Sequence, residues 1–273
     1  MVAGSAAGVS AIFKAPLTGA VFALEVPYLD DLARRMLLPA LVGSGSGYLV
    51  FASIKGTTPL FPVDALSGFA VRDLLGAMAV GVVAGLGARA FAWMLGQAKR
   101  VQAGSKHRLG VCLGASLALA ALFAIGWALT DEPLMIGPGY HVVRWASEPG
   151  HSALLLAAIL VLRCLATTAA VAGGGVGGLF VPLVVAGALT GSLIASVVAA
   201  DDLSLFIVVG VAAFLGAGYR VPLAAVTFVA EATGRPSFIV PGLFAAVAAE
   251  LTMGMVSVTS YQRDPASGRQ SRA

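Results

Sequence analysis

The sequence predicts an all-α protein that crosses a membrane several times. Of its 273 residues, 59% are hydrophobic and only 11% are charged, and the mean hydropathy is +0.93. Soluble domains carry roughly a quarter charged residues, so these side chains cannot cover a water-soluble globule of this length. Since about 20 apolar residues of helix span a bilayer core, a multi-pass protein is expected. Charged residues are absent from six stretches: 36–54, 74–88, 109–130, 164–200, 203–219 and 236–249.

In the first half of the chain, apolar runs and turn residues alternate. Proline, glycine and charged residues separate the runs, so they set the expected element boundaries. Gly81 and Gly85 have the GxxxG spacing, which either allows close contact between two helices or only reflects the abundance of glycine. The expected elements are a short helix over 5–26, a cytoplasmic turn from Pro27 to Arg35, a span over 32–54, a loop over 55–70 and a long helix over 71–98.

The second half combines full spans with broken helices. The glycines from Gly173 to Gly175, together with Pro182, interrupt an apolar stretch that is otherwise long enough to span. Non-helical backbone at membrane depth survives only where protein buries it or where it lines a watery cavity, so a solute pathway is indicated. The expected elements are a span over 109–130, a loop over 131–150, a span over 151–172, a broken glycine-rich segment over 173–200, two short helices over 203–217 and 221–232 split at Gly218, and a last helix over 236–256.

Two segments near opposite ends of the chain repeat each other. FKAPLTGAVFALE from Phe13 matches YRVPLAAVTFVAE from Tyr219 at an offset of 206 residues, and seven identities join 6–25 to 212–231. Each copy is a short helix opened by proline and closed by glutamate. Repeated halves are how many transporters build a midplane site, although one sequence does not say whether the repeats are inverted.

The segment GGGVGGLFVPL, from Gly173 to Leu183, has the composition of an anion site. Glycines let backbone N–H groups approach a ligand, and Pro182 fits the first turn of a following helix. The N-terminus of that helix offers unpaired N–H groups and a partial positive charge, so no basic side chain is needed there. The alternative is a flexible hinge between two apolar helices.

These motifs resemble the CLC family of chloride channels and chloride/proton antiporters. Gly178-Leu179-Phe180-Val181-Pro182 is similar to the family's GxFxP motif, and RCLATTAAVAGGGVGG, from Arg163, is similar to its preceding helix. The repeated segments resemble the helix after its second anion-binding motif and a late pore helix. The resemblance covers nearly the whole chain and corresponds to the C-terminal two-thirds of a CLC membrane domain. It implies a CLC-type fold with repeated halves and short broken intramembrane helices.

The resemblance also implies a set of anion ligands. The backbone N–H groups of Leu179 and Phe180, presented after Gly178, would hold the central chloride. Tyr261 in SVTSYQRD matches the family tyrosine whose hydroxyl touches that ion; the alternative for Tyr261 is an aromatic anchor at the membrane surface. A hydroxyl contacts an anion without trapping it as a full charge would, and conduction requires binding weak enough to release the ion.

The sequence departs from the family at two places. The GSGIP-type serine motif and the GxEGP motif with the gating glutamate are absent, and they would lie upstream of Met1. Proton-coupled members commonly carry a glutamate where this chain has Val26, which weakens the case for antiport. Glu25, Val26 and Glu231 are therefore the candidates for gating or a proton pathway. The alternative for the two glutamates is a solvated or paired carboxylate at a helix end.

Together these features predict a protein that moves chloride or a similar anion, as a channel or by chloride/proton exchange. Another solute transporter with a broken-helix site, or an inactive fragment, stays open. No enzymatic constellation, nucleic-acid surface, metal or cofactor is expected, with chloride as the transported ion. We expect a transmembrane domain over 1–257, a short helix and polar cytoplasmic tail over 258–273, integral multi-pass insertion in lipid of the plasma (inner) membrane, and a homodimer implied by the resemblance.

Overall fold

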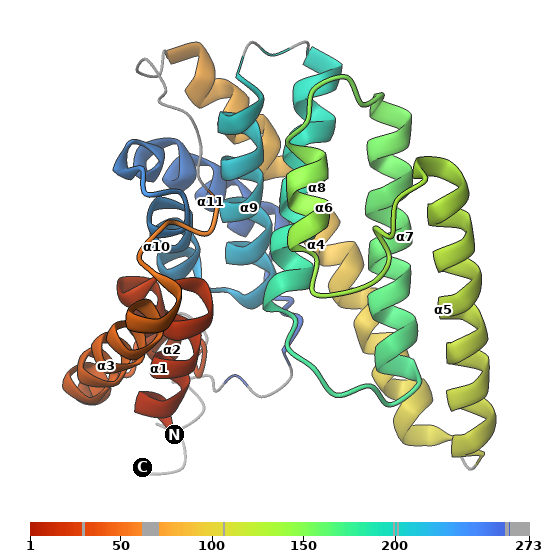
Figure 1. Ribbon diagram of the computed structural model, residues 1–273, viewed down its shortest axis with the longest axis horizontal. Helices are drawn as coiled ribbons and strands as arrows, with labels where there is room; N and C mark the ends of the chain where they lie inside the picture. Colours follow the sequence, from red (N-terminus) through yellow and green to blue (C-terminus); the bar gives the residue numbers. More distant parts are fainter. Residues whose placement is uncertain are drawn as a thin grey trace.

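The structure is a computed structural model and consists of packed helices (Figure 1). It describes residues 1–28, 31–61, 71–105, 107–198, 200, 202–259 and 262. The prediction of an all-α membrane protein is confirmed. The elements in order are α1 (Val2–Phe13), α2 (Pro16–Glu25), η1 (Arg34–Met36), α3 (Leu37–Lys55), α4 (Val71–Gly104), α5 (Arg108–Thr130), α6 (Tyr140–Ala146), α7 (Ala153–Ala172), α8 (Phe180–Val198), α9 (Leu203–Tyr219), α10 (Pro222–Thr233), η2 (Pro236–Phe238) and α11 (Ile239–Met253).

The core of the molecule is the pair α8 and α9, which lies in the middle of Figure 1. Every residue of α9 from Leu205 to Tyr219 is buried, which is the pattern of a helix that is apolar all round. A Cβ on Gly187 would lie 2.5 Å from the carbonyl oxygen of Gly210, and a Cβ on Gly191 would overlap the backbone of Phe206. The two helices therefore touch backbone to backbone, and larger residues would push them apart.

The GxxxG pair of α4 makes the close contact that its spacing allows. A Cβ on Gly81 would overlap the carbonyl oxygen of Ala245, and one on Gly85 would overlap the carbonyl oxygen of Ala249. Both partners lie on α11, which packs along α4. The helix-contact interpretation of the motif is thus confirmed.

The long helix α4 runs to Gly104, past its expected end at 98, and three other expected elements differ for local reasons. The segment 5–26 is two helices, because Lys14 adopts a left-handed conformation (φ 53°) and Pro16 opens α2. The break after α9 falls at Arg220 (φ 57°) and not at Gly218, which stays helical. The expected loop 131–150 contains the short helix α6, which begins after left-handed glycine Gly139. A left-handed residue ends a helix by turning its backbone out of the hydrogen-bond ladder.

The repeat extends well beyond the segment that sequence identity marks. α1, α2, η1 and α3 recur as α9, α10, η2 and α11, in the same order and with similar lengths. Lys14 and Arg220 are equivalent residues and share the same left-handed conformation. The N–H of the next residue also bonds back equivalently, from Ala15 to Ser10 and from Val221 to Gly216. Each copy is therefore a helix, a left-handed break, a second helix and a third helix.

The outward faces of the bundle suit lipid. Six helices among the described residues are long and apolar enough to cross a membrane. α5 lies at one edge of the bundle against α7, and only 6% of its span is buried (Figure 1). It exposes large apolar side chains such as Leu109, Leu113 and Leu117. Such a surface is stable in hydrocarbon and not in water, so the chain is an integral, multi-pass membrane protein.

Candidate functional site

The glycine-rich segment ends at the N-terminus of α8, where the sequence predicts the anion. Gly177 and Gly178 are exposed, and a Cβ on either would meet no atom within 4 Å. Leu179 precedes α8, and its carbonyl accepts the first helical bond, from Leu183 N–H at 3.1 Å. Because the first N–H groups of a helix have no partner within it, this end presents donors beside open space.

The N–H of Leu179 donates to the hydroxyl of Tyr219 at 3.1 Å. Tyr219 is the last residue of α9 and is only 6% exposed. Sequence reasoning assigned Leu179 to the anion but gave no role to the Tyr219 hydroxyl. The signal that could have found it is the repeat, since Phe13, without a hydroxyl, is the equivalent residue in the first copy.

A cavity of about 420 Å³ opens beside this helix end. Leu179, Gly178 and Pro182 line it, together with Arg163 from α7. The Arg163 guanidinium donates to the carbonyl oxygen of Leu134 at 3.1 Å. The anion segment itself carries no basic side chain, but Arg163, which lies sixteen positions before Leu179 on α7, lines the same cavity. A cation here favours entry of anions.

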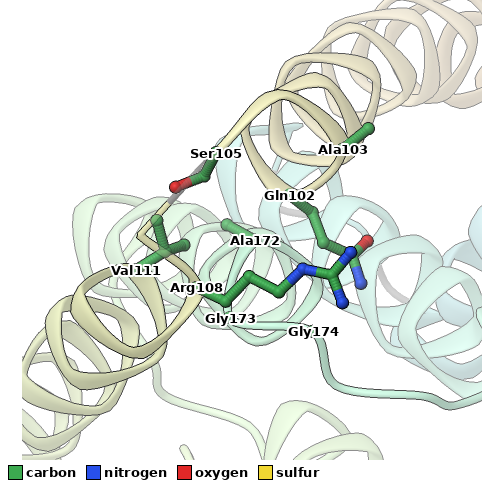
Figure 2. A pocket seen from close by; sticks show the side chains of 8 residues that line it. All are labelled: Gln102, Ala103, Ser105, Arg108, Val111, Ala172, Gly173 and Gly174. Atoms are coloured by element: carbon green, nitrogen blue, oxygen red, sulfur yellow. The ribbon is translucent and has the colours of Figure 1, made fainter.

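A second hollow, of about 400 Å³, lies at the start of the glycine-rich segment. Figure 2 shows the side chains of Gln102 and Arg108 pointing toward each other over Gly173 and Gly174. Gln102 lies in the last turn of the long α4 and Arg108 begins α5, so the hollow lies where these two helix ends meet the end of α7. It places the exposed Arg108 near the glycine-rich segment, in addition to the partly buried Arg163.

An aromatic cluster joins the two repeats to the start of α8. The cluster consists of Phe13, Phe22, Phe180, Tyr219 and Phe228. Phe13 packs edge to face on Phe228, with ring centroids 5.4 Å apart, and Tyr219 packs edge to face on Phe22 at 5.5 Å. These two contacts are equivalent under the repeat, because Phe13 matches Tyr219 and Phe22 matches Phe228. Phe180 lies between them, 4.4 Å from Phe13 and 5.3 Å from Phe22.

The two repeat glutamates cap each other's helices. Glu231, near the end of α10, accepts the N–H groups of Leu17 and Thr18 at 2.8 and 2.7 Å, and also the Thr18 hydroxyl. Glu25, at the end of α2, accepts the N–H groups of Leu223 and Ala224 at 3.2 and 2.9 Å. We call these contacts the reciprocal carboxylate caps. Each helix ends at the start of the other, so α2 and α10 run antiparallel.

The caps also explain why each repeat carries a carboxylate at the end of its second helix. A carboxylate at a helix N-terminus satisfies N–H groups and faces the positive end of the helix dipole. The alternative was a helix-end carboxylate that is solvated or paired with a basic side chain. Instead, Glu25 is only 7% exposed, and both glutamates accept hydrogen bonds from backbone N–H groups of the other repeat. Glu25 also lines a hollow of about 320 Å³ with Arg34 and Glu250.

The basic residue of each repeat closes the third helix of its own copy. Lys14 donates to the carbonyl oxygen of Lys55, the last residue of α3, at 3.2 Å. Arg220 donates to the carbonyl oxygen of Gly254, just after α11, and forms an ion pair with Glu250 at 3.2 Å. Cations at helix C-termini donate to the last carbonyl groups, which have no hydrogen-bond partner within the helix. The matched charge in the sequence therefore has a matched structural role.

Two of the predicted residues, Val26 and Tyr261, remain. Val26 follows α2 directly and is partly buried, next to the buried carboxylate of Glu25. Tyr261 lies outside the described residues, as does most of the tail over 258–273. No cluster of histidine, cysteine and acidic residues suited to a metal occurs among the described residues. What the site offers is a backbone amide donor, bonded to a tyrosine hydroxyl, near a cavity with a basic side chain.

Comparison with known proteins places this geometry in a family. The family model described as voltage gated chloride channel matches residues 1–254. A relative from Citrobacter koseri named H(+)/Cl(−) exchange transporter ClcA is 26% identical over 262 residues, covering 92% of this chain and 54% of the relative. The protein of the same name from Salmonella typhimurium is 25% identical with the same coverage. The chain therefore spans about half the length of the curated relatives it matches.

Solved structures agree on the fold. The crystal structure of a CLC-type fluoride/proton antiporter superimposes with a TM-score of 0.82 and 20% identity, covering 96% of this chain and 64% of that one. A slow cyanobacterial Cl−/H+ antiporter superimposes with a TM-score of 0.80 and 20% identity, covering 92% and 60%. Since the family model matches over nine-tenths of the sequence, this chain belongs to the voltage-gated chloride channel (CLC) family.

Proposed function

We propose that this chain forms part of an anion pathway, in which the N–H groups of Leu179 and Phe180 hold chloride or a similar anion. The observation that carries the proposal is the direction of the Leu179 N–H. This N–H group points from the start of α8 to the buried Tyr219 hydroxyl in the aromatic cluster, between the two repeats. A donor at this place can serve an anion without a neutralising charge.

Physical chemistry supports an anion here over a cation. The helix N-terminus carries a partial positive charge, and Arg163 lines the adjoining cavity. Amide donors bind an anion weakly enough for it to leave, which transport requires. The relatives named as H(+)/Cl(−) exchange transporters support chloride as the substrate.

For Glu25 and Glu231 we propose a structural role ahead of a gating role. Both carboxylates are engaged by backbone N–H groups of the other repeat. Val26 cannot carry a proton. Channel-like conduction and chloride/proton exchange are separated by one measurement, which is uphill proton movement driven by a chloride gradient in proteoliposomes. Such movement identifies exchange, and its loss in Glu25→Gln but not Glu231→Gln would assign the proton to Glu25 in spite of its cap.

The proposal is tested by deleting one N–H group. Leu179→Pro removes the donor at a position just before the helix, where proline is tolerated. Leu179→Ala is the matched control, because it removes the side chain and keeps the N–H. We expect Leu179→Pro to lower chloride flux from proteoliposomes and chloride binding by calorimetry at least tenfold, while Leu179→Ala stays within about threefold, since hydrogen bonds to charged partners contribute about 1.5–3 kcal/mol.

The opposite results are equally clear. Equal chloride binding by the proline and alanine variants would overturn the assignment to the Leu179 amide. A wild-type chain that neither binds nor moves chloride, bromide or nitrate would favour another solute transporter or an inactive fragment. A homodimer in lipid is part of the proposal, and cross-linking in native membranes tests it.

A further inference from the structure

The amide proposed for the anion already has a partner within the protein. Leu179 N–H donates to the Tyr219 hydroxyl at 3.1 Å, and Tyr219 is only 6% exposed. Its ring packs edge to face on Phe22, and its backbone carbonyl accepts the amide of Gln262 at 2.7 Å. The phenol oxygen therefore lies where the N–H points, on a buried ring that packs against Phe22.

The repeat separates the role of the ring from the role of the hydroxyl. Phe13, the equivalent of Tyr219, makes the equivalent edge-to-face contact with Phe228 and has no hydroxyl. The ring contact between the repeats therefore forms without a hydroxyl. The hydroxyl is an addition in the second copy alone, and it bonds the backbone group just before α8.

We propose that the Tyr219 hydroxyl competes with the anion for the Leu179 amide and so sets the anion affinity of the site. The inference rests on the proposed function. An N–H group has one hydrogen, and the phenol oxygen occupies the position along it that an anion would take. Anion binding at Leu179 must therefore replace an existing hydrogen bond. This internal competition keeps binding weak enough for the ion to leave.

Tyr219→Phe tests the competition, because it removes one oxygen and keeps the ring contact that Phe13 shows to be sufficient. The experiment measures chloride affinity by calorimetry on the full chain in detergent. Losing one net intramolecular hydrogen bond changes an equilibrium constant by about two- to tenfold. We therefore expect Tyr219→Phe to bind chloride tighter than wild type by that factor. Tyr48→Phe, on α3, is the matched control and should stay within about twofold.

A second measurement does not depend on affinity. In chloride-free buffer, the Leu179 amide resonance of a ¹⁵N-leucine-labelled chain, assigned by its loss in Leu179→Ala, should move upfield in Tyr219→Phe and stay in place in Tyr48→Phe. An unmoved resonance, or equal or weaker chloride affinity in Tyr219→Phe, overturns the inference while leaving the proposed function intact. If wild type and both tyrosine variants bind no chloride, the proposed function fails and this inference fails with it.

Discussion

Replacing Glu231 by glutamine should loosen the contact between the two repeats. The carboxylate accepts the N–H groups of Leu17 and Thr18 at 2.8 and 2.7 Å. Glutamine keeps one acceptor oxygen, but its NH₂ group cannot accept the second N–H. One charge-assisted bond, at about 1.5–3 kcal/mol, is lost, along with a helix-dipole contribution of about 0.3–1 kcal/mol. We expect the free energy of unfolding to fall by about 2–4 kcal/mol.

Glu25→Gln should cost a similar amount, because Glu25 caps α10 in the same way. The two caps hold one helix pair, so their effects should couple. The double variant should cost less than the sum of the single variants, by about 0.5–3 kcal/mol. Glu148→Gln is the control, since Glu148 is exposed, and it should change stability by less than about 0.5 kcal/mol.

The assay is unfolding in mixed micelles at increasing fractions of denaturing detergent, followed by tryptophan fluorescence. Single glutamine variants that lie within about 0.5 kcal/mol of wild type would refute the reciprocal carboxylate caps. Strict additivity of the two substitutions would refute only their coupling. A gain in stability for either variant would show that burying the carboxylate costs more than its bonds return.

Two further predictions concern packing and charge. Gly85→Leu should destabilise the protein by at least about 1–3 kcal/mol, because a side chain there overlaps the backbone of Ala249. Gly96→Ala lies in the same helix but meets open space, so it should stabilise the protein slightly. Thermal unfolding in detergent compares the two variants. Arg220→Met removes the bonds to the end of α11 and should lower the free energy of unfolding by about 3–5 kcal/mol. Lys14→Met, at the partly exposed equivalent position, should lower it by less than about 1 kcal/mol. Equal losses would contradict the buried role of Arg220.

Patterns along the chain predicted much of the fold and part of the site. Stretches without charge mark the spans, and the run from Gly173 to Pro182 marks the anion segment, because both are local properties of composition. The loop 131–150 concealed α6, since a seven-residue helix is too short to leave a clear period. The contact of Arg163 with the cavity also escaped prediction, because it depends on the direction in which the chain returns after α7.

The sequence by itself determined that the chain lies in a membrane, that two segments repeat, and that a glycine-rich helix start suits an anion. Only the tertiary structure decided how these parts meet. Glu231 finds its partners 213 and 214 positions away, and the Leu179 amide finds Tyr219 40 positions away. Such pairs depend on how helices cross, and no local pattern encodes that. The antiparallel arrangement of α2 and α10 is one result, because each helix start needs an acceptor that its own repeat does not supply.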